Sequence, residues 1–289
     1  MKTYFDIQGD GGSDVVAQVE SQQEAIRGAL SGVRNLVAVG SGKGGVGKST
    51  VTMGLAQALK ARGASVAILD ADFNGPCQAH LAGLEAHPWV PSPEGLSVPR
   101  REDGIGVVSM GSIVPASRPV AFDTVSQGDE HVWRSTREFA FLGQLLSSMA
   151  WGALDFVLFD LPPGAERTVQ YADFLPGGVS FVLVTVPSDV SRGVVARSVS
   201  ALAGTSARML GYVENMAGYF CRDCGEIKAL FPSSGAVLDV PLLGRVPFDP
   251  ELASLCDRGW PEPLEGGEKA VEAIRTVVEN LLQALEARA

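Results

Sequence analysis

Residues 36–50 of the chain read LVAVGSGKGGVGKST, an apolar run followed directly by a loop rich in glycine and lysine. Gly42, Gly47, Lys48 and Ser49 match the spacing G-x-x-x-x-G-K-S/T. The apolar run predicts a buried strand, and residues 48–62 after the loop have helical spacing. This motif binds phosphate when it lies between a strand and a helix, so the context is the required one. The stretch therefore predicts a phosphate-binding loop in an α/β fold.

The loop residues have distinct chemical roles in phosphate binding. Glycines let backbone N–H groups turn inward around a β-phosphate, and the helix N-terminus adds partial positive charge. We expect Lys48 to reach the β- and γ-phosphates of ATP and the Ser49 hydroxyl to ligate Mg²⁺. Gly40, Gly42 and Gly45 also fit the dinucleotide pattern G-x-G-x-x-G, but that pattern does not explain the lysine and the serine. The expected nucleotide-binding residues of the loop are Gly42, Lys43, Gly44, Gly45, Val46, Gly47, Lys48, Ser49 and Thr50.

The composition is that of a globular chain without a basic surface. The chain has 289 residues, of which 46% are apolar and 19% are charged, and its formal net charge is −10. Nucleic acids and anionic membranes both bind clustered Lys and Arg, so we expect neither as a partner. Residues 1–15 lack the apolar core of a secretory signal, and no apolar run approaches the about 20 residues of a membrane-spanning helix. We therefore expect a cytoplasmic protein whose four cysteines are thiols or metal ligands and not structural disulfides.

Apolar runs alternate with helical patterns along most of the chain. The runs are continuously hydrophobic, which favours a parallel sheet covered on both faces. We expect one P-loop NTPase domain over residues 1–289, an α/β fold with a doubly wound, mostly parallel sheet and helices on both faces. The expected strands are 36–40, 65–69, 106–110, 155–159, 179–186, 209–213 and 242–246, and the expected helices are about 48–62, 135–150, 189–203, 250–257 and 268–287.

Three further segments stand outside this alternation. Residues 15–33 have helical spacing and are expected to form an N-terminal helix before the first strand. Residues 86–103 are rich in proline, which predicts a surface excursion and not a domain linker. Residues 217–233 carry the cysteine pair Cys221 and Cys224 and are expected to form a loop.

Carboxylates follow two of the expected strands. Asp70 and Asp72 come at the end of one strand, and Asp160 ends another, just before LPPG at 161–164. The carboxyl ends of parallel strands lie next to the phosphate loop, where groups that sense the γ-phosphate belong. The turn after Asp160 resembles a Walker B motif, which implies that Asp160 holds Mg²⁺ through water. An aspartate at such a place can instead be a helix cap or a turn residue.

Cys221 and Cys224 form a C-x-x-C pair, which alone is compatible with several kinds of site. It can be a redox pair, half of a zinc site or half of an iron–sulfur site. A zinc ion or a [4Fe–4S] cluster usually takes four ligands, and the chain contains no second pair. A two-fold dimer would bring two pairs together and complete the set.

Residues 43–50, KGGVGKST, resemble the deviant Walker A motif of the MinD/ParA group of dimeric ATPases. This resemblance implies that Lys43 crosses a dimer interface to the partner's nucleotide and stabilises charge in phosphoryl transfer. The alternative is a solvated loop lysine. Residues 70–76, DADFNGP, look like switch I of the same group, which implies that Asp72 orients the attacking water. The residues expected in catalysis are then Lys43, Lys48 and Asp72.

A longer set of motifs resembles the Mrp/ApbC family of iron–sulfur cluster carrier ATPases. The motifs extend from about Leu36 to Pro261 and include SGKGGVGKST at 41–50, DAD and GP within 70–76, VWR at 132–134, DLPPG at 160–164, ENM at 214–216 and LGRVPFDP at 243–250. The resemblance implies that ATP hydrolysis accompanies the transfer of a [4Fe–4S] cluster to apo iron–sulfur proteins. The cluster would bridge the Cys221 and Cys224 pairs of a homodimer, and Asn215 would contact the adenine base.

The chain departs from that family's pattern beside two of these motifs. Cys77 stands where the family usually has serine, and Glu166 and Arg167 stand where it usually has glycine and aspartate. The added arginine lies beside switch II and reverses the local charge, so we expect altered hydrolysis and intact nucleotide binding. Cys77 and Cys256 are interpreted as small packing residues.

Three other functions are compatible with parts of the sequence. A MinD- or ParA-like positioning ATPase would bind a membrane or nucleoid, but the expected last helix at 268–287 is acidic, whereas membrane-surface helices are basic. An iron-protein reductase also holds a cluster at a dimer interface, but its ligand cysteines are widely separated in sequence. An ATPase with a structural zinc at Cys221 and Cys224 would use the same thiolates.

Overall fold

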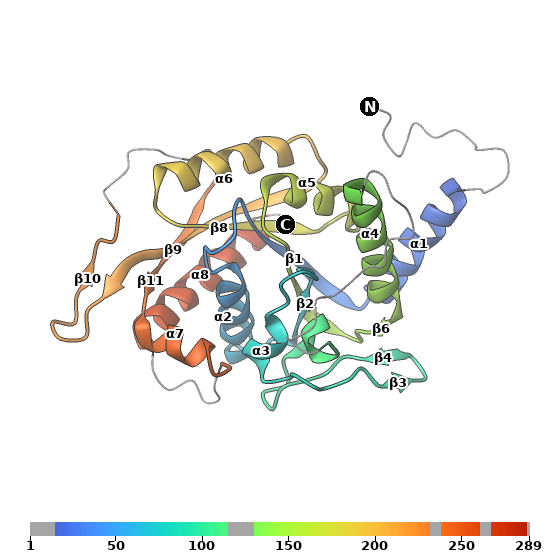
Figure 1. Ribbon diagram of the computed structural model, residues 1–289, viewed down its shortest axis with the longest axis horizontal. Coiled ribbons are helices and arrows are strands. Elements are labelled where there is room, and N and C mark those ends of the chain that lie inside the picture. Colours follow the sequence, from blue (N-terminus) through green and yellow to red (C-terminus); the bar gives the residue numbers. More distant parts are fainter. Residues whose placement is uncertain (1–14, 115–129, 232–237, 261–266, 288–289) are drawn as a thin grey trace.

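A central sheet of eight strands organises the fold. The computed structural model of the protein describes residues 15–114, 130–231, 238–260 and 267–287. Seven strands follow the order β10-β9-β8-β1-β7-β2-β5, and β11 pairs with β9 (Figure 1). These pairings are parallel except for the antiparallel one between β9 and β10. The strands are β1 Val33–Ser41, β2 Val66–Asp70, β5 Gly106–Val108, β7 Leu154–Asp160, β8 Ser180–Thr185, β9 Arg208–Phe220, β10 Ile227–Lys228 and β11 Leu242–Phe248.

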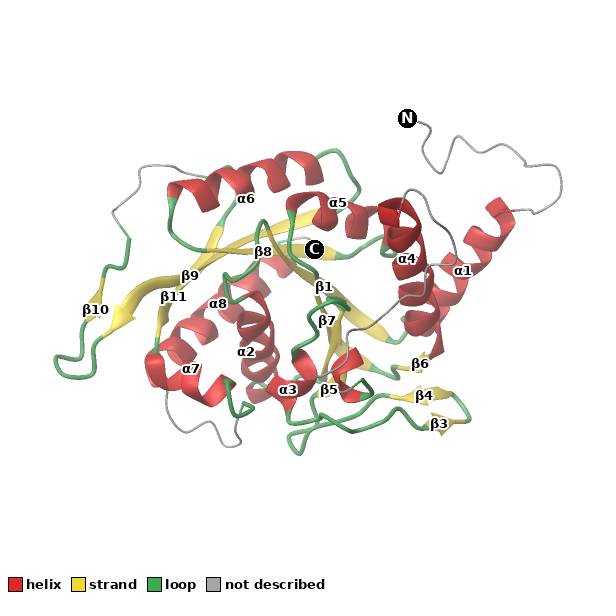
Figure 2. Cartoon of the chain, in the orientation of Figure 1, coloured by secondary structure: helices red, strands yellow, loops and turns green. Residues whose placement is uncertain are grey.

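Helices cover both faces of this sheet, as Figure 2 shows. Along β1 the side chains alternate between two cores: Val37 and Val39 join the core with α2 and α8, and Ala38 joins the core with α1, α4 and α5. The observed architecture confirms the predicted mostly parallel α/β sheet. No helix in the described part of the chain is long and apolar enough to cross a membrane. The helices are α1 Val15–Ala29, α2 Lys48–Ala61, α3 Gln78–Ala82, α4 Glu130–Ser148, α5 Ala165–Phe174, α6 Asp189–Leu202, α7 Pro250–Cys256 and α8 Glu268–Glu286.

Two boundaries near functional segments differ from those expected. The N-terminal helix ends at Ala29 and not at residue 33, where β1 already begins. Gly32, between the helix and the strand, lets the chain pack closely against Gly152, because a Cβ there would lie only 2.7 Å from the Gly152 carbonyl oxygen. Strand β9 continues to Phe220, so the first part of the expected 217–233 loop is strand, and residues 232–233 lie outside the described ranges.

Other differences concern short elements. Helices α3 and α5 were not expected; α5 begins directly after the prolines and glycine of 161–164, which predicted only a turn. The helix expected at 135–150 starts at Glu130 and ends at Ser148, and Met149–Ala150 forms strand β6 instead. The proline-rich segment 86–103 contains strands β3 (Pro91–Ser92) and β4 (Gly95–Ser97), which form a small second sheet with β6.

Strand β9 changes direction after its pairing with β8, which runs through Glu214. Met216 has a φ of +54°, a left-handed angle that side chains with a Cβ seldom adopt. Beyond it, Tyr219 and Phe220 pair with β10. The end of β9 and β10 form a hairpin that projects from the body of the sheet (Figure 1).

Candidate functional site

The phosphate loop joins the carboxyl end of β1 to the start of α2. Gly45 and Gly47 have φ angles of +78° and +77°, which glycine adopts without strain. A side chain at Gly42 would overlap Val194 of α6, and one at Gly47 would overlap the Asn215 amide. Neighbours from α6 and β9 therefore enclose the loop at both ends and leave space only for glycine there.

Lys48 is buried beneath the loop and forms an ion pair with Asp160 at the end of β7. Its Nζ also donates to the Ser49 hydroxyl at 3.3 Å. Burial is the largest single influence and would lower the pKa of Lys48, but the contact with Asp160 and the charges of Asp70 and Asp72 together outweigh it, and the pKa lies above its ordinary value. The residue predicted to bind phosphate thus lies in contact with the two residues predicted to hold Mg²⁺.

The Asp160 carboxylate is fully buried and accepts further hydrogen bonds on both oxygens. Its Oδ1 accepts from the Thr52 hydroxyl at 3.3 Å, and its Oδ2 accepts from Gln78 Nε2 at 2.8 Å. The same Gln78 nitrogen donates to the Ser49 carbonyl at 3.0 Å. Gln78 therefore ties β7 to the phosphate loop, a contact that no motif in the sequence indicated.

The two aspartates after β2 have different surroundings. Asp70 is fully buried, and its Oδ2 accepts from the Cys77 and Gln78 N–H groups at 3.0 and 2.9 Å and from the Ser109 hydroxyl at 3.0 Å. Burial raises the pKa of Asp70 to about 7. Asp72 is half-buried, and burial raises its pKa as well. Asp70 organises the turn after β2, and Asp72 is the carboxylate that solvent can reach.

Asn215 contacts the phosphate loop within the chain, whereas the Lys43 side chain is exposed. Asn215 donates from Nδ2 to the Val46 carbonyl of the loop at 2.9 Å. Lys43 is exposed at the start of the loop, and its carbonyl accepts from the Ser41 hydroxyl at 3.0 Å. One chain thus brings Lys48, Asp160 and Asn215 together and leaves Lys43 at the surface.

Arg167 of α5 is paired within the chain. It forms an ion pair with the buried Glu138 of α4, and its guanidinium carbon lies 5.6 Å from the centre of the Phe139 ring and 5.5 Å from that of Tyr171. Burial raises the pKa of Glu138, and the Arg167 charge opposes that rise. The reversal of charge expected at 166–167 is therefore compensated by Glu138, while Glu166 is exposed.

A hydroxyl extends this network to the segment after β2. Tyr171 OH lies 3.0 Å from Glu138 Oε1 and 2.9 Å from the Ala71 carbonyl. Ala71 stands between Asp70 and Asp72. The network therefore connects the segments after β2 and β7, and sequence analysis had singled out neither Glu138 nor Tyr171.

The cysteine pair occupies the turn between β9 and β10. The Gly225 N–H donates to the Cys221 carbonyl at 2.8 Å, and the Cys221 N–H donates to the Glu226 carbonyl at 2.9 Å. Hydrogen bonds from the Cys224 backbone and side chain lower the pKa of Cys221, so the two thiols lie together. Cys224 is exposed and Cys221 half-exposed. Over the described ranges, no three His, Cys, Asp or Glu side chains gather to hold a metal ion.

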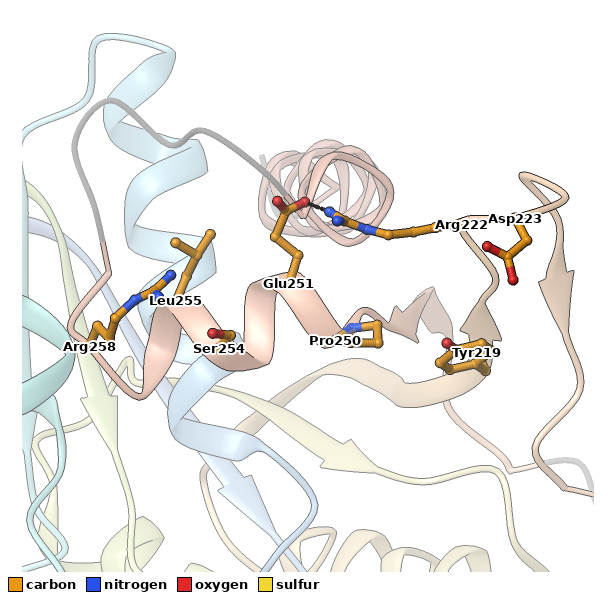
Figure 3. Close-up of a pocket in the computed structure, with 8 residues that line it drawn as sticks. All are labelled: Tyr219, Arg222, Asp223, Pro250, Glu251, Ser254, Leu255 and Arg258. Atoms are coloured by element: carbon orange, nitrogen blue, oxygen red, sulfur yellow. Dashed lines mark hydrogen bonds and ion pairs between the residues drawn. The ribbon is translucent and has the colours of Figure 1, made fainter.

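A pocket of about 520 Å³ lies between this turn and α7 (Figure 3). Arg222, which separates the two cysteines, forms an ion pair with Glu251 at the start of α7. The Glu251 carboxylate also accepts from the Gly267 N–H at 3.0 Å. The turn is thereby attached to α7. The pocket is lined by Tyr219, Arg222, Asp223, Pro250, Glu251, Ser254, Leu255 and Arg258.

Cys77 and Cys256 lie beside the phosphate loop and not at the turn. Burial raises the pKa of Cys77 to about 12, and its thiol is hydrogen-bonded to Ser49. Burial likewise raises the pKa of Cys256 to about 11, and its thiol is hydrogen-bonded to Thr50. Both thiols are therefore held protonated, and each contacts a loop hydroxyl, which the sequence did not indicate.

The strand–loop–helix of residues 33–61, with Lys48 under the loop and a carboxylate at the end of the neighbouring strand, makes this chain a P-loop NTPase. A family model described as "ParA: NUBPL iron-transfer P-loop NTPase" matches residues 32–282. The chain belongs to this family.

Curated relatives cover most of the chain. An iron-sulfur cluster carrier protein of Methanocaldococcus jannaschii is 32% identical over 276 residues, which are 93% of this chain and 91% of the relative. A cytosolic Fe-S cluster assembly factor, cfd1, of Aspergillus terreus is 37% identical over 255 residues, which are 80% of this chain and 81% of the relative.

Solved structures show the same fold. A nucleotide-binding protein in complex with ADP from Archaeoglobus fulgidus is similar with a TM-score of 0.70 and 33% identity, covering 84% of this chain and 94% of that one. The septum site-determining protein MinD of Pyrococcus horikoshii, in complex with Mg-ADP, has a TM-score of 0.57 and 21% identity, covering 89% and 99% of the two chains. The second likeness concerns the fold alone.

Proposed function

We propose that this protein is an ATP-hydrolysing carrier that holds a [4Fe–4S] cluster between two copies of the chain and transfers it to apo iron–sulfur proteins. The observation that carries the proposal is the exposed turn with two adjacent thiols, Cys221 and Cys224, which no third His, Cys, Asp or Glu joins to form a metal site within the described residues. A cluster needs four thiolates, and a two-fold axis supplies the second pair. The names of the relatives from M. jannaschii and A. terreus support the same cargo.

In the proposed nucleotide site, residues 42–50 bind ATP, and Lys48 contacts the β- and γ-phosphates. Ser49 and Asp160 would hold Mg²⁺, since a hydroxyl and a carboxylate are the oxygen ligands that this ion prefers and both lie against Lys48. Mg²⁺, when bound, neutralises charge on the phosphates. When ATP binds, Lys48 gives up its ion pair with Asp160 and contacts phosphate oxygens instead. Thr52 and Gln78 continue to hold the Asp160 carboxylate through their hydrogen bonds.

The remaining roles concern hydrolysis and the base. Lys43 acts on the nucleotide of the partner subunit, a role supported by its exposure at the start of the loop. Asp72 orients the attacking water, since its carboxylate is accessible and that of Asp70 is not. Asn215 of β9, which donates to the Val46 carbonyl of the phosphate loop, contacts the adenine base.

The setting of this activity is also part of the proposal. Residues 1–289 act as a single P-loop domain in the cytoplasm, as a homodimer, without a nucleic-acid or membrane partner. The formal net charge of −10 disfavours anionic surfaces. The A. terreus relative is named as a cytosolic factor, which supports the compartment.

Anaerobic reconstitution with iron and sulfide tests the cluster proposal. We expect about four iron and four sulfide ions per two chains. Cys221→Ser and Cys224→Ser should each lose the cluster and weaken the dimer. Cys77→Ser and Cys256→Ser are the matched controls, because they change thiols next to the phosphate loop, and they should retain it.

Two results would overturn the carrier proposal. The first is stoichiometric zinc without iron, which would make the pair a structural clamp. The second is a cluster that survives the combined change of Cys221 and Cys224. Either result would leave the nucleotide site as a separate finding.

A further inference from the structure

Gln78, the first residue of α3, has a buried side chain whose hydrogen bonds to Asp160 go beyond what the function proposed above requires. Its exposed fraction is 0%. Its Nε2 donates to Asp160 Oδ2 at 2.8 Å and to the Ser49 carbonyl at 3.0 Å. A carboxylate and a carbonyl are acceptors only, so the orientation of the amide is fixed by its partners.

The other end of the same amide is unsatisfied. Gln78 Oε1 is buried and has no hydrogen-bond partner in the described part of the chain. An unpaired buried acceptor is destabilising, and native proteins rarely leave one. An amide oxygen beside the residues of a cation site can accept from water on that cation. The orphan oxygen indicates a donor that arrives with the ligand.

The backbone of Gln78 is fixed as firmly as its side chain. Its N–H donates to the buried Asp70 carboxylate at 2.9 Å, and the same carboxylate accepts from the Ser109 hydroxyl at 3.0 Å. Gln78 is therefore held by the end of β2 through its backbone. Its amide in turn holds the end of β7 and the phosphate loop.

We propose that Gln78 is a positioning residue for the divalent cation that accompanies the nucleotide. When Lys48 leaves Asp160 for the phosphates, Gln78 keeps the carboxylate in place, and the remaining Thr52 hydroxyl contact is longer, at 3.3 Å. Its Oε1 accepts a hydrogen bond from water on the cation. The inference rests on the proposed nucleotide site and is independent of the cysteine pair.

Calorimetric titration of ADP with and without Mg²⁺ tests this role in the full chain. Gln78→Leu should lower the Mg²⁺ affinity of the ADP complex by about 10-fold or more, the size of effect seen for outer-shell partners of metal ligands. ADP affinity without Mg²⁺ should stay within about twofold of that of the unaltered chain, because Gln78 makes only one hydrogen bond to the loop, to the Ser49 carbonyl. Asn280→Leu is the control: it removes a hydrogen bond of 2.8 Å from a side-chain amide to the Leu243 carbonyl and should change neither affinity.

The outcomes separate the two proposals. Unchanged Mg²⁺ affinity in a folded Gln78→Leu protein overturns the role of Gln78 and leaves the nucleotide site intact. Equal losses with and without Mg²⁺ also overturn it, because Gln78 would then only shape the loop. Gln78→Met, which lacks hydrogen-bonding groups and is closer in volume, gives the same test if the leucine variant does not fold. Absence of ADP binding in the unaltered chain overturns the nucleotide proposal and this inference together.

Discussion

The phosphate loop and the cysteine turn are joined by the same strand, β9, yet they are built in opposite ways. At the loop, the Lys48 and Asp160 side chains are 7% and 0% exposed and are held by hydrogen bonds within one chain. At the turn, Cys224 is exposed, and the side chains of the pair contact each other and the backbone around them. The loop is an enclosed site, and the turn presents two adjacent thiols at the surface.

This difference is the one expected between a site whose residues all come from one chain and a site whose residues come from two copies. A chain that binds a nucleotide by itself can order every contact before the ligand arrives, at the cost of burying charges that must stay paired. A site shared across a two-fold axis has to remain accessible in each copy. Changes to the buried residues at the loop should therefore affect folding and binding together, and changes to the cysteines of the turn should affect only what is bound there.

The largest contrast is expected between Lys48→Ala and Lys43→Ala. Removing Lys48 leaves Asp160 as an unpaired buried charge, which should lower the free energy of unfolding by about 3–5 kcal/mol. It should also abolish ADP and ATP binding, measured by calorimetry. Lys43→Ala, at an exposed lysine of the same loop, should stay within about 0.5 kcal/mol of the unaltered chain and keep nucleotide binding.

Nucleotide affinity that survives Lys48→Ala would refute the phosphate-loop site. Lys43→Ala also sharpens the comparison, because it should lower turnover through the partner subunit. Mixing Lys43→Ala chains with hydrolysis-deficient Asp72→Asn chains distinguishes a lysine that acts on the partner's nucleotide from one that acts on the nucleotide of its own chain. A lysine that acts only within its own chain gives activity that simply follows the fraction of intact protomers.

The thiols of the two regions should differ next in their rates of alkylation. Hydrogen bonds from Cys224 lower the pKa of Cys221, while burial raises the pKa of Cys77 to about 12 and that of Cys256 to about 11. Only the thiolate reacts, so iodoacetamide at neutral pH should modify Cys221 about 100-fold faster than Cys77 or Cys256 in cluster-free protein.

Mass spectrometry of peptides across a pH series measures these rates. The rate at Cys221 should level off at lower pH than the other two, because its thiolate forms first. Similar rates at all three positions would show that the loop does not enclose Cys77 and Cys256 in solution.

The smallest contrast concerns the network that connects the segments after β2 and β7. Changing Glu166 and Arg167 to glycine and aspartate removes the positive charge that is paired with Glu138 and places a second carboxylate beside it. We expect a loss of about 1–3 kcal/mol in unfolding free energy and a changed rate of ATP hydrolysis. Adding Glu138→Gln should restore most of the stability, because the two positions interact directly. If neither the substitution at 166–167 nor Glu138→Gln alters the rate of hydrolysis, the network does not influence Asp72.

The loop could be predicted from the sequence because its residues are contiguous and each has a fixed place in one motif. Gln78 could not, since its bond to Asp160 joins positions 82 apart and it begins a helix of five residues, too short to show a period. The charge of Arg167 was visible in the sequence, but its partner lies 29 positions away. Strand β9 was expected to end at Val213, because the polar and small residues after it interrupt the apolar run.

The backbone of Met216 has a consequence for how the two regions are oriented. A left-handed methionine costs about 1–2 kcal/mol, so its neighbours must hold it there. Its Cε lies 3.7 Å from the place where a side chain at Gly47 would begin, and Asn215 before it is bonded to the loop. The hairpin beyond it carries the thiols at its tip, and Tyr219 pairs with Phe248 of β11 while Arg222 is paired with Glu251. The left-handed residue therefore sets the direction in which the hairpin leaves the sheet, and these contacts hold the thiols in that direction.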